Sequence, residues 1–214
     1  DKTDNPPRPA AVRLAFRVSY LGNRFFGSQM QQSSRTVEGE FIGACRRLSL
    51  FEDWRQAGFV SAGRTDRGVH ARGQVIAFST ETPDRAISTI NLQLPPDIWC
   101  TGYARVADGF HPRYDAKFRT YRYYFPEVPP QKKDMVLASQ YFLGSHDFSN
   151  FARVKDRNPE RNILSARIGE EGGFLFFEVT AESFLWHQVH CMAAALLRVG
   201  FGESPAESVR NSLL

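Results

Sequence analysis

A strictly alternating segment near the start of the chain, residues 12–20, constrains the fold more than any other feature of the sequence. Its even positions are Val12, Leu14, Phe16, Val18 and Tyr20, and its odd positions are Arg13, Ala15, Arg17 and Ser19. A period of two is the period of a β-strand, whose side chains point alternately to the two faces of a sheet. The segment therefore predicts a strand with one buried face and one open face.

Helix and strand patterns alternate along the rest of the chain. A helix is predicted after Thr36, a residue suited to an N-cap, and another from Pro83 to Gln93, ahead of Pro95 and Pro96. Further strands are predicted at residues 59–62, 74–78, 118–125, 163–168 and 174–181, and further helices before Gly144 and over residues 185–199. The last two strands form a predicted hairpin that turns at Glu171-Gly172-Gly173. This order predicts an α+β fold of two similar halves, each an antiparallel sheet covered by helices.

Composition narrows the class of protein. The 214 residues contain no apolar run near the ~18 residues that a membrane-spanning helix needs. The three cysteines, Cys45, Cys100 and Cys191, are far apart and odd in number, which favours reduced thiols and a cytoplasmic location. The polar, proline-rich residues 1–10 are predicted to be a disordered lead-in.

The charge of the chain is mildly basic, +4 with an isoelectric point of about 9.1. The distribution of the basic residues is more informative than the net charge. Many of them lie in two short stretches, where they could bind the phosphates of an RNA backbone. The basic residues of these stretches are Arg64, Arg67, Arg72, Arg113, Lys117, Arg119 and Arg122. A solvated basic face without any nucleic-acid partner is the alternative interpretation.

The segment GRTDRGVHARGQ, residues 63–74, is the most informative for chemistry. Its glycines permit sharp turns or close approach to another polymer, and Arg64 and Arg67 lie beside Asp66. Neighbouring arginines favour the ionised carboxylate and also bind phosphates. Asp66 is therefore a candidate nucleophile or base at the floor of a basic cleft. The alternative is a surface turn with Asp66 in a structural ion pair.

These residues resemble the signature of the TruA-type pseudouridine synthases, G-R-T-D-x-G-V-H-A. Other segments resemble that family in the same order: YLGNRFFGSQMQ (20–31), TVEG (36–39), LPPDI (94–98), FHPRYDAKFRTYRY (110–123), GSHDFSNF (144–151) and SFLWHQVHCM (183–192). The later motifs are closer to archaeal and eukaryotic members. The resemblance covers nearly the whole chain after residue 10. It implies an N-terminal subdomain (11–110) that carries the catalytic aspartate, a C-terminal subdomain (111–214) and a catalytic cleft between them.

The resemblance also implies an activity, the cofactor-free isomerisation of uridine to pseudouridine at positions 38–40 in the anticodon stem-loop of tRNA, by a homodimer. Asp66 would either attack the anomeric carbon or remove the sugar 2′ proton, and both remain open. Tyr121 would stack on the uracil and help to deprotonate carbon 5, and Arg64 would help to displace the target base. Leu185 would line the uracil pocket and His190 would contact the substrate site, as would Arg67, His70 and Arg119. For Arg64 a structural pair with Asp66, and for Leu185 plain core packing, are the alternatives.

Three departures from the family pattern bear on activity. His190 stands where the family has the arginine that pairs with the catalytic aspartate, Ser28 replaces a tryptophan of the entry loop, and the family's last segment is absent. Imidazole cannot grip a carboxylate in a bidentate way, and it titrates near neutrality. His190 at this position has three possible explanations: a functional pair with Asp66, a drifted or engineered substitution, or an impaired enzyme.

Two other functions compete with an active isomerase. One is a non-catalytic tRNA-binding or RNA-chaperone protein on the same fold. The other is a nuclease or glycosidase that uses Asp66, which the absence of a second nearby carboxylate disfavours. His187, His190 and Cys191 are too few to predict a metal site, so no metal and no small-molecule cofactor is expected.

Overall fold

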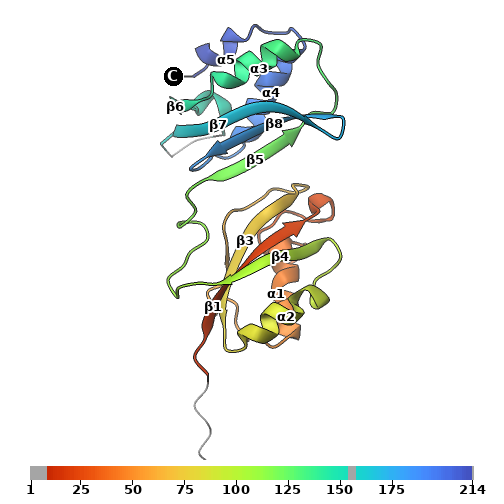
Figure 1. Cartoon of the computed structure of the whole chain (residues 1–214), viewed down its shortest axis with the longest axis vertical. Helices are drawn as coiled ribbons and strands as arrows, with labels where there is room; N and C mark the ends of the chain where they lie inside the picture. Colours follow the sequence, from red (N-terminus) through yellow and green to blue (C-terminus); the bar gives the residue numbers. More distant parts are fainter. Residues whose placement is uncertain (1–8, 154–157, 214) are drawn as a thin grey trace, which may run out of the picture. The chain divides into compact units, whose positions relative to one another are not determined.

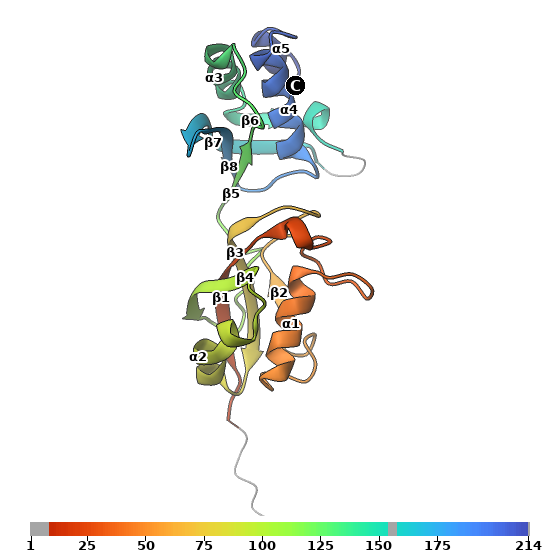
Figure 2. The same cartoon turned by 90° about the vertical axis from the view of Figure 1, so that its right-hand side faces the viewer.

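The computed structural model describes residues 9–153 and 158–213 (Figures 1 and 2). The chain forms two compact units, Asp1–Ala116 and Lys117–Leu214, each with its own sheet and its own core. The predicted disordered lead-in falls mostly on residues 1–8, which lie outside the described residues. Both sheets are antiparallel and both are covered by helices, so the predicted α+β fold class is confirmed.

The N-terminal unit has a four-stranded sheet in the order β2-β3-β1-β4. Its strands are β1 (Val12–Tyr20), β2 (Val60–Ser61), β3 (Ala71–Thr80) and β4 (Ile98–Arg105). The helices α1 (Val37–Arg47) and α2 (Pro83–Gln93) cover one face of this sheet, and a short 3-10 helix, Gly22–Arg24, follows β1 (Figure 2). Both predicted helices are confirmed. The hydroxyl of Thr36 caps α1 by accepting the N–H of Gly39 at 3.1 Å.

The core of the N-terminal unit forms between β1 and the two helices. The apolar side chains of β1 are buried, and Phe16 stacks on Phe78 of β3 at 5.7 Å between ring centroids. Phe41 of α1 lies against both rings. Burying such aromatic side chains removes large apolar areas from water, which is the main stabilising term for a unit of this size.

The prediction that the second face of β1 is open is wrong. Arg13, Ala15 and Ser19 are buried, and of the odd positions only Arg17 is exposed. The guanidinium of Arg13 donates to the carbonyl of Phe110 at 2.7 Å and to that of Gly58 at 3.2 Å. Because β1 is a central strand, chain segments on both sides cover it, and its polar side chains find carbonyl acceptors there.

The C-terminal unit has a four-stranded sheet in the order β5-β8-β7-β6. Its strands are β5 (Arg119–Tyr124), β6 (Gly144–Asp147), β7 (Glu160–Glu171) and β8 (Phe174–Ala181). One face is covered by α3 (Lys132–Gln140), α4 (Gln188–Gly200) and α5 (Glu207–Asn211), and a short 3-10 helix, Ser149–Phe151, follows β6 (Figure 1). The predicted hairpin is confirmed, since Gly172 and Gly173 turn between β7 and β8 with φ of 58° and 82°.

Two strands are missing from the predictions, and one helix begins later than predicted. No strand is predicted at residues 98–105 or 144–147, yet β4 and β6 form there, each at the edge of its sheet. Helix α4 begins at Gln188 and not at residue 185, because His187 has the left-handed φ of 61° and interrupts the helix. Among the described residues, no helix has both the length and the apolar character needed to cross a membrane.

Candidate active site

The loop between β2 and β3, residues 62–70, carries four of the predicted site residues. The side chains of Arg64, Asp66, Arg67 and His70 are all exposed. The N–H of Val69 donates to the carbonyl of Asp66 at 3.2 Å, which closes a turn around the carboxylate. This unit therefore presents Asp66 on a tight, solvent-facing turn with basic side chains on either side.

The segment that follows β1 is hydrogen-bonded to this loop. The N–H of Gly22 donates to Nδ1 of His70 at 3.0 Å, so the imidazole is an acceptor there and carries its proton on Nε2. The N–H of Ser28 donates to the carbonyl of Thr65 at 3.0 Å. The hydrogen bond from Gly22 gives His70 a structural function in the loop. A contact of the other ring nitrogen, Nε2, with the substrate remains a prediction.

The backbone approach at Gly22 leads to a first prediction. A Cβ at Gly22 would lie 1.9 Å from the carbonyl oxygen of Val69, and a backbone atom cannot move aside as a flexible side chain can. We expect Gly22→Ala to lower the free energy of unfolding by about 1–3 kcal/mol, the usual range for overpacking. Urea unfolding of the variant measures this loss.

A matched control for Gly22→Ala is Gly109→Ala. An added Cβ at Gly109 meets no heavy atom within 4 Å, and Gly109 has no positive φ. We expect this control to unfold with the midpoint of the parent chain. Equal unfolding midpoints for the two alanine variants would contradict the close contact between Gly22 and Val69.

A cationic and aromatic pair flanks the loop. The guanidinium of Arg67 lies over the ring of Phe26, 4.4 Å from its centroid, and both side chains are exposed. Flat aromatic and guanidinium surfaces are the ones on which unpaired nucleobases stack. Sequence reasoning named Arg67 but missed Phe26, since an aromatic residue in a loop carries no signal of a partner far along the chain.

The C-terminal unit gathers the remaining predicted residues along one face of β5. Arg119 and Tyr121, two of the predicted residues, lie on this face together with Tyr123, which is not one of them, and each contacts the chain after β8. Arg119 donates to the carbonyl of Glu182 at 2.7 Å. The ring of Tyr121 meets that of Phe184 edge to face at 5.2 Å, and the ring of Tyr123 lies 6.1 Å from that of His190. Arg119 and Tyr121 therefore lie beside the segment 182–190, which carries Leu185 and His190.

Leu185 lies in a turn of this segment and not in a helix. It is 7% exposed, and its N–H donates to Oε1 of Gln188 at 2.8 Å. Gln188 is fully buried, and its Nε2 has no hydrogen-bond partner among the residues that the structure describes. His190 is exposed on the first turn of α4, with its ring 5.6 Å from that of His187. Neither Phe184 nor Gln188 was predicted as part of a site.

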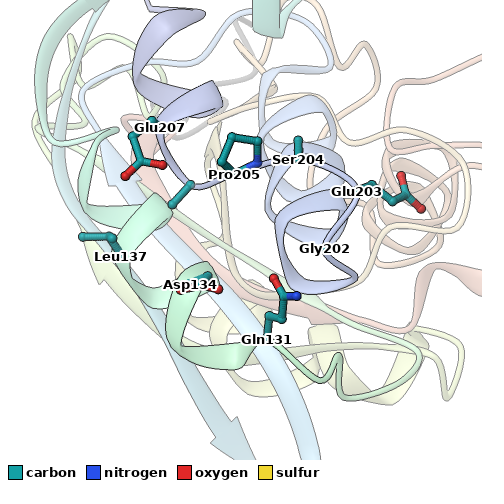
Figure 3. Close-up of a pocket in the computed structure, with 9 residues that line it drawn as sticks. Gln131, Asp134, Leu137, Gly202, Glu203, Ser204, Pro205 and Glu207 are labelled. Carbon is teal, nitrogen blue, oxygen red and sulfur yellow. The ribbon is translucent and has the colours of Figure 1, made fainter.

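A separate hollow of about 420 Å³ lies beside α3 and α5 (Figure 3). The residues that line it include the acidic Asp134, Glu203 and Glu207. Three acidic side chains repel phosphate, so this hollow is unsuited to an RNA backbone. Over residues 9–153 and 158–213, no three His, Cys, Asp or Glu side chains gather as metal ligands would.

Known proteins resemble this chain over nearly its whole length. A tRNA pseudouridine synthase family profile matches residues 138–214. A tRNA pseudouridine synthase A from Methanoculleus marisnigri is 61% identical over 202 residues, which are 94% of this chain and 74% of the relative. Proteins of the same name from Methanosphaerula palustris and Thermococcus kodakarensis are 54% and 40% identical, again over 94% of this chain and over 72% and 76% of the relatives. With this identity and coverage, the chain belongs to the tRNA pseudouridine synthase A family of isomerases.

Proposed function

We propose that this chain isomerises uridine to pseudouridine in the anticodon stem-loop of tRNA, at positions 38–40, with Asp66 as the essential carboxylate. The observation that carries the proposal is the presentation of Asp66 on an exposed turn between Arg64 and Arg67. The reaction is an atom-balanced rearrangement. The C1′–N1 bond breaks, the C1′–C5 bond forms, C5 loses a proton and N1 gains one, so no oxidant or cofactor is required.

A carboxylate suits the first step of this reaction. Breaking the C1′–N1 bond develops positive charge on the sugar, which an adjacent anion stabilises. The same carboxylate can instead remove the 2′ proton, and the proposal holds for either route. Arg64 helps to displace the target base, and Arg67 on Phe26 offers a stacking surface beside it.

The C-terminal unit carries the other residues that we propose act on the substrate. Tyr121 stacks on the flipped uracil and assists loss of the C5 proton, while Leu185 and His190 border the base and Arg119 contacts the substrate. By family likeness we propose that the protein works in the cytoplasm and forms a homodimer. Light scattering of the purified chain tests the oligomeric state.

Release of tritium from tRNA labelled at C5 of uridine tests the activity. We expect release, and we expect the modified positions to fall in the anticodon stem-loop when pseudouridines are mapped by carbodiimide labelling and primer extension. Release with modification elsewhere would overturn the stem-loop assignment alone. A chain that binds tRNA and releases no tritium would instead support a non-catalytic RNA-binding protein, the alternative that His190 favours.

His190 gives a second prediction. A guanidinium can bind a carboxylate with two parallel hydrogen bonds, whereas the shorter imidazole cannot. We therefore expect His190→Arg to raise kcat/KM at pH 8 by about 10-fold, which corresponds to one charge-assisted hydrogen bond.

Ser165→Arg is the charge-matched control for His190→Arg. Ser165 is exposed on β7 of the same unit, so its replacement adds a positive charge outside the proposed site. We expect no gain in kcat/KM from this control. An equal gain from both variants would mean that added charge improves general tRNA binding and that position 190 is not special.

A further inference from the structure

Three hydrogen bonds converge on Thr65, the residue that precedes Asp66. Its N–H donates to Oγ of Ser28 at 2.8 Å, and its carbonyl accepts the N–H of Ser28 at 3.0 Å. Its hydroxyl is hydrogen-bonded to the phenol of Tyr20 at 2.7 Å. Ser28 is 2% exposed and Tyr20 is 1% exposed, so both partners belong to the rigid interior of the N-terminal unit.

The side chain of Tyr20 lies in the core of the N-terminal unit. Tyr20 is the last residue of β1, and its ring packs against Phe25 with 6.5 Å between centroids. A buried ring has little rotational freedom, so the position of its hydroxyl is defined by the packing around it. Through this hydroxyl the core sets the position of the Thr65 side chain.

The anchoring of Thr65 sets the geometry of Asp66 through the backbone. Because the peptide group is planar, fixing the carbonyl of Thr65 also fixes the N–H and Cα of Asp66. Gly27 packs closely against the same carbonyl, since a Cβ there would lie 3.0 Å from the Thr65 oxygen. The exposed Asp66 has little apolar packing of its own to hold it.

We propose that Tyr20, Ser28 and Thr65 are positioning residues that hold Asp66 in its reactive geometry. This inference rests on the proposed function, in which Asp66 reacts with the sugar. Sequence comparison alone suggests that Ser28 simply lacks the aromatic surface of the family's tryptophan. In the structure Ser28 has a polar function instead, because its hydroxyl and its N–H both bind Thr65.

The test separates positioning from folding with hydroxyl deletions. Tyr20→Phe and Thr65→Val each remove one partner of the hydroxyl pair and preserve side-chain volume. We expect each to lower kcat by roughly 10- to 100-fold, the loss typical of a misplaced reacting group, with KM for tRNA unchanged. Thr65→Ser, which restores the hydroxyl, should restore kcat. The double variant should lose no more than the worse single variant, because both delete the same bond.

Thermal unfolding and two reference variants complete the experiment. Tyr103→Phe removes an exposed phenol from β4 of the same unit and should leave kcat unchanged. If Tyr20→Phe and Thr65→Val keep the wild-type kcat and only lower the Tm, the positioning function is overturned. An inactive Asp66→Asn would in that case still support the proposed function. An active Asp66→Asn would overturn both.

Discussion

Replacing Asp66 with asparagine is expected to lower the rate of tritium release from C5-labelled tRNA by roughly 10⁴-fold or more, the size of effect seen when an essential reacting group is removed. Asparagine has nearly the shape of aspartate, but its amide is a poor nucleophile and a poor base. It also cannot stabilise positive charge on the sugar. Either proposed route for Asp66 therefore fails in the variant. Asp66→Ala should behave in the same way.

Binding of tRNA should survive the loss of Asp66. The carboxylate contributes repulsion toward phosphates and not attraction, so Kd from filter binding should be unchanged or lower. Glu52→Gln makes the same change of charge at another exposed position of the N-terminal unit, and it should keep full activity. Turnover by Asp66→Asn within about 10-fold of the parent chain would contradict the assignment, since a bystander carboxylate contributes little.

The elements with strong local signals could be predicted from sequence. Strand β1, helix α2 and the hairpin at Gly172 and Gly173 follow from an alternating pattern, a proline start and a pair of turn glycines. The edge strands β4 and β6 lack such signals. Exposure alternates along β4 from Ile98 to Tyr103, but the exposed positions include the aromatic Trp99 and Tyr103, so the sequence shows no polar–apolar alternation there.

Long-range polar contacts were beyond sequence reasoning. Arg13 and Ser19 look like solvent-facing residues of a strand, and only the fold shows that carbonyls of distant segments receive them. The same holds for Thr65, whose partners lie 45 and 37 residues earlier in the chain. A motif such as G-R-T-D predicts which residue reacts, whereas the contacts that would orient this residue depend on tertiary packing.

A salt bridge near the candidate site illustrates a further contact of this kind. The guanidinium of Arg35 binds both carboxylate oxygens of Asp97, at 2.7 and 2.9 Å. Hydrogen bonds from Arg35 hold the pKa of Asp97 below its usual value. The N–H of Leu21 donates to the carbonyl of Asp97, so Asp97 joins the segment that follows β1 to the connection between α2 and β4. Nothing in the spacing of residues 35 and 97 predicts it.

Tyr121→Phe is expected to slow tritium release by about 10²- to 10⁴-fold, the range for loss of a general acid or base. The substitution removes only the phenol oxygen. The ring remains, so its edge-to-face contact with Phe184 and any stacking on uracil should persist. We therefore expect an unchanged Kd for tRNA, an unchanged Tm and a lower kcat, measured by single-turnover tritium release.

Tyr123→Phe is the matched control because it removes the same atom two residues along the same face of β5. Tyr123 is also half-buried, and its ring packs against Phe125 at 5.4 Å, which is the environment of a core aromatic residue. We expect this variant to keep kcat within about 3-fold, as for a partly exposed hydroxyl outside the reaction. If both variants retained parental turnover, Tyr121 would be a packing residue like its neighbour, and the C5 proton would have to leave by way of another group. If only Tyr121→Phe is slow, the phenol oxygen and not the ring carries the chemistry at this position.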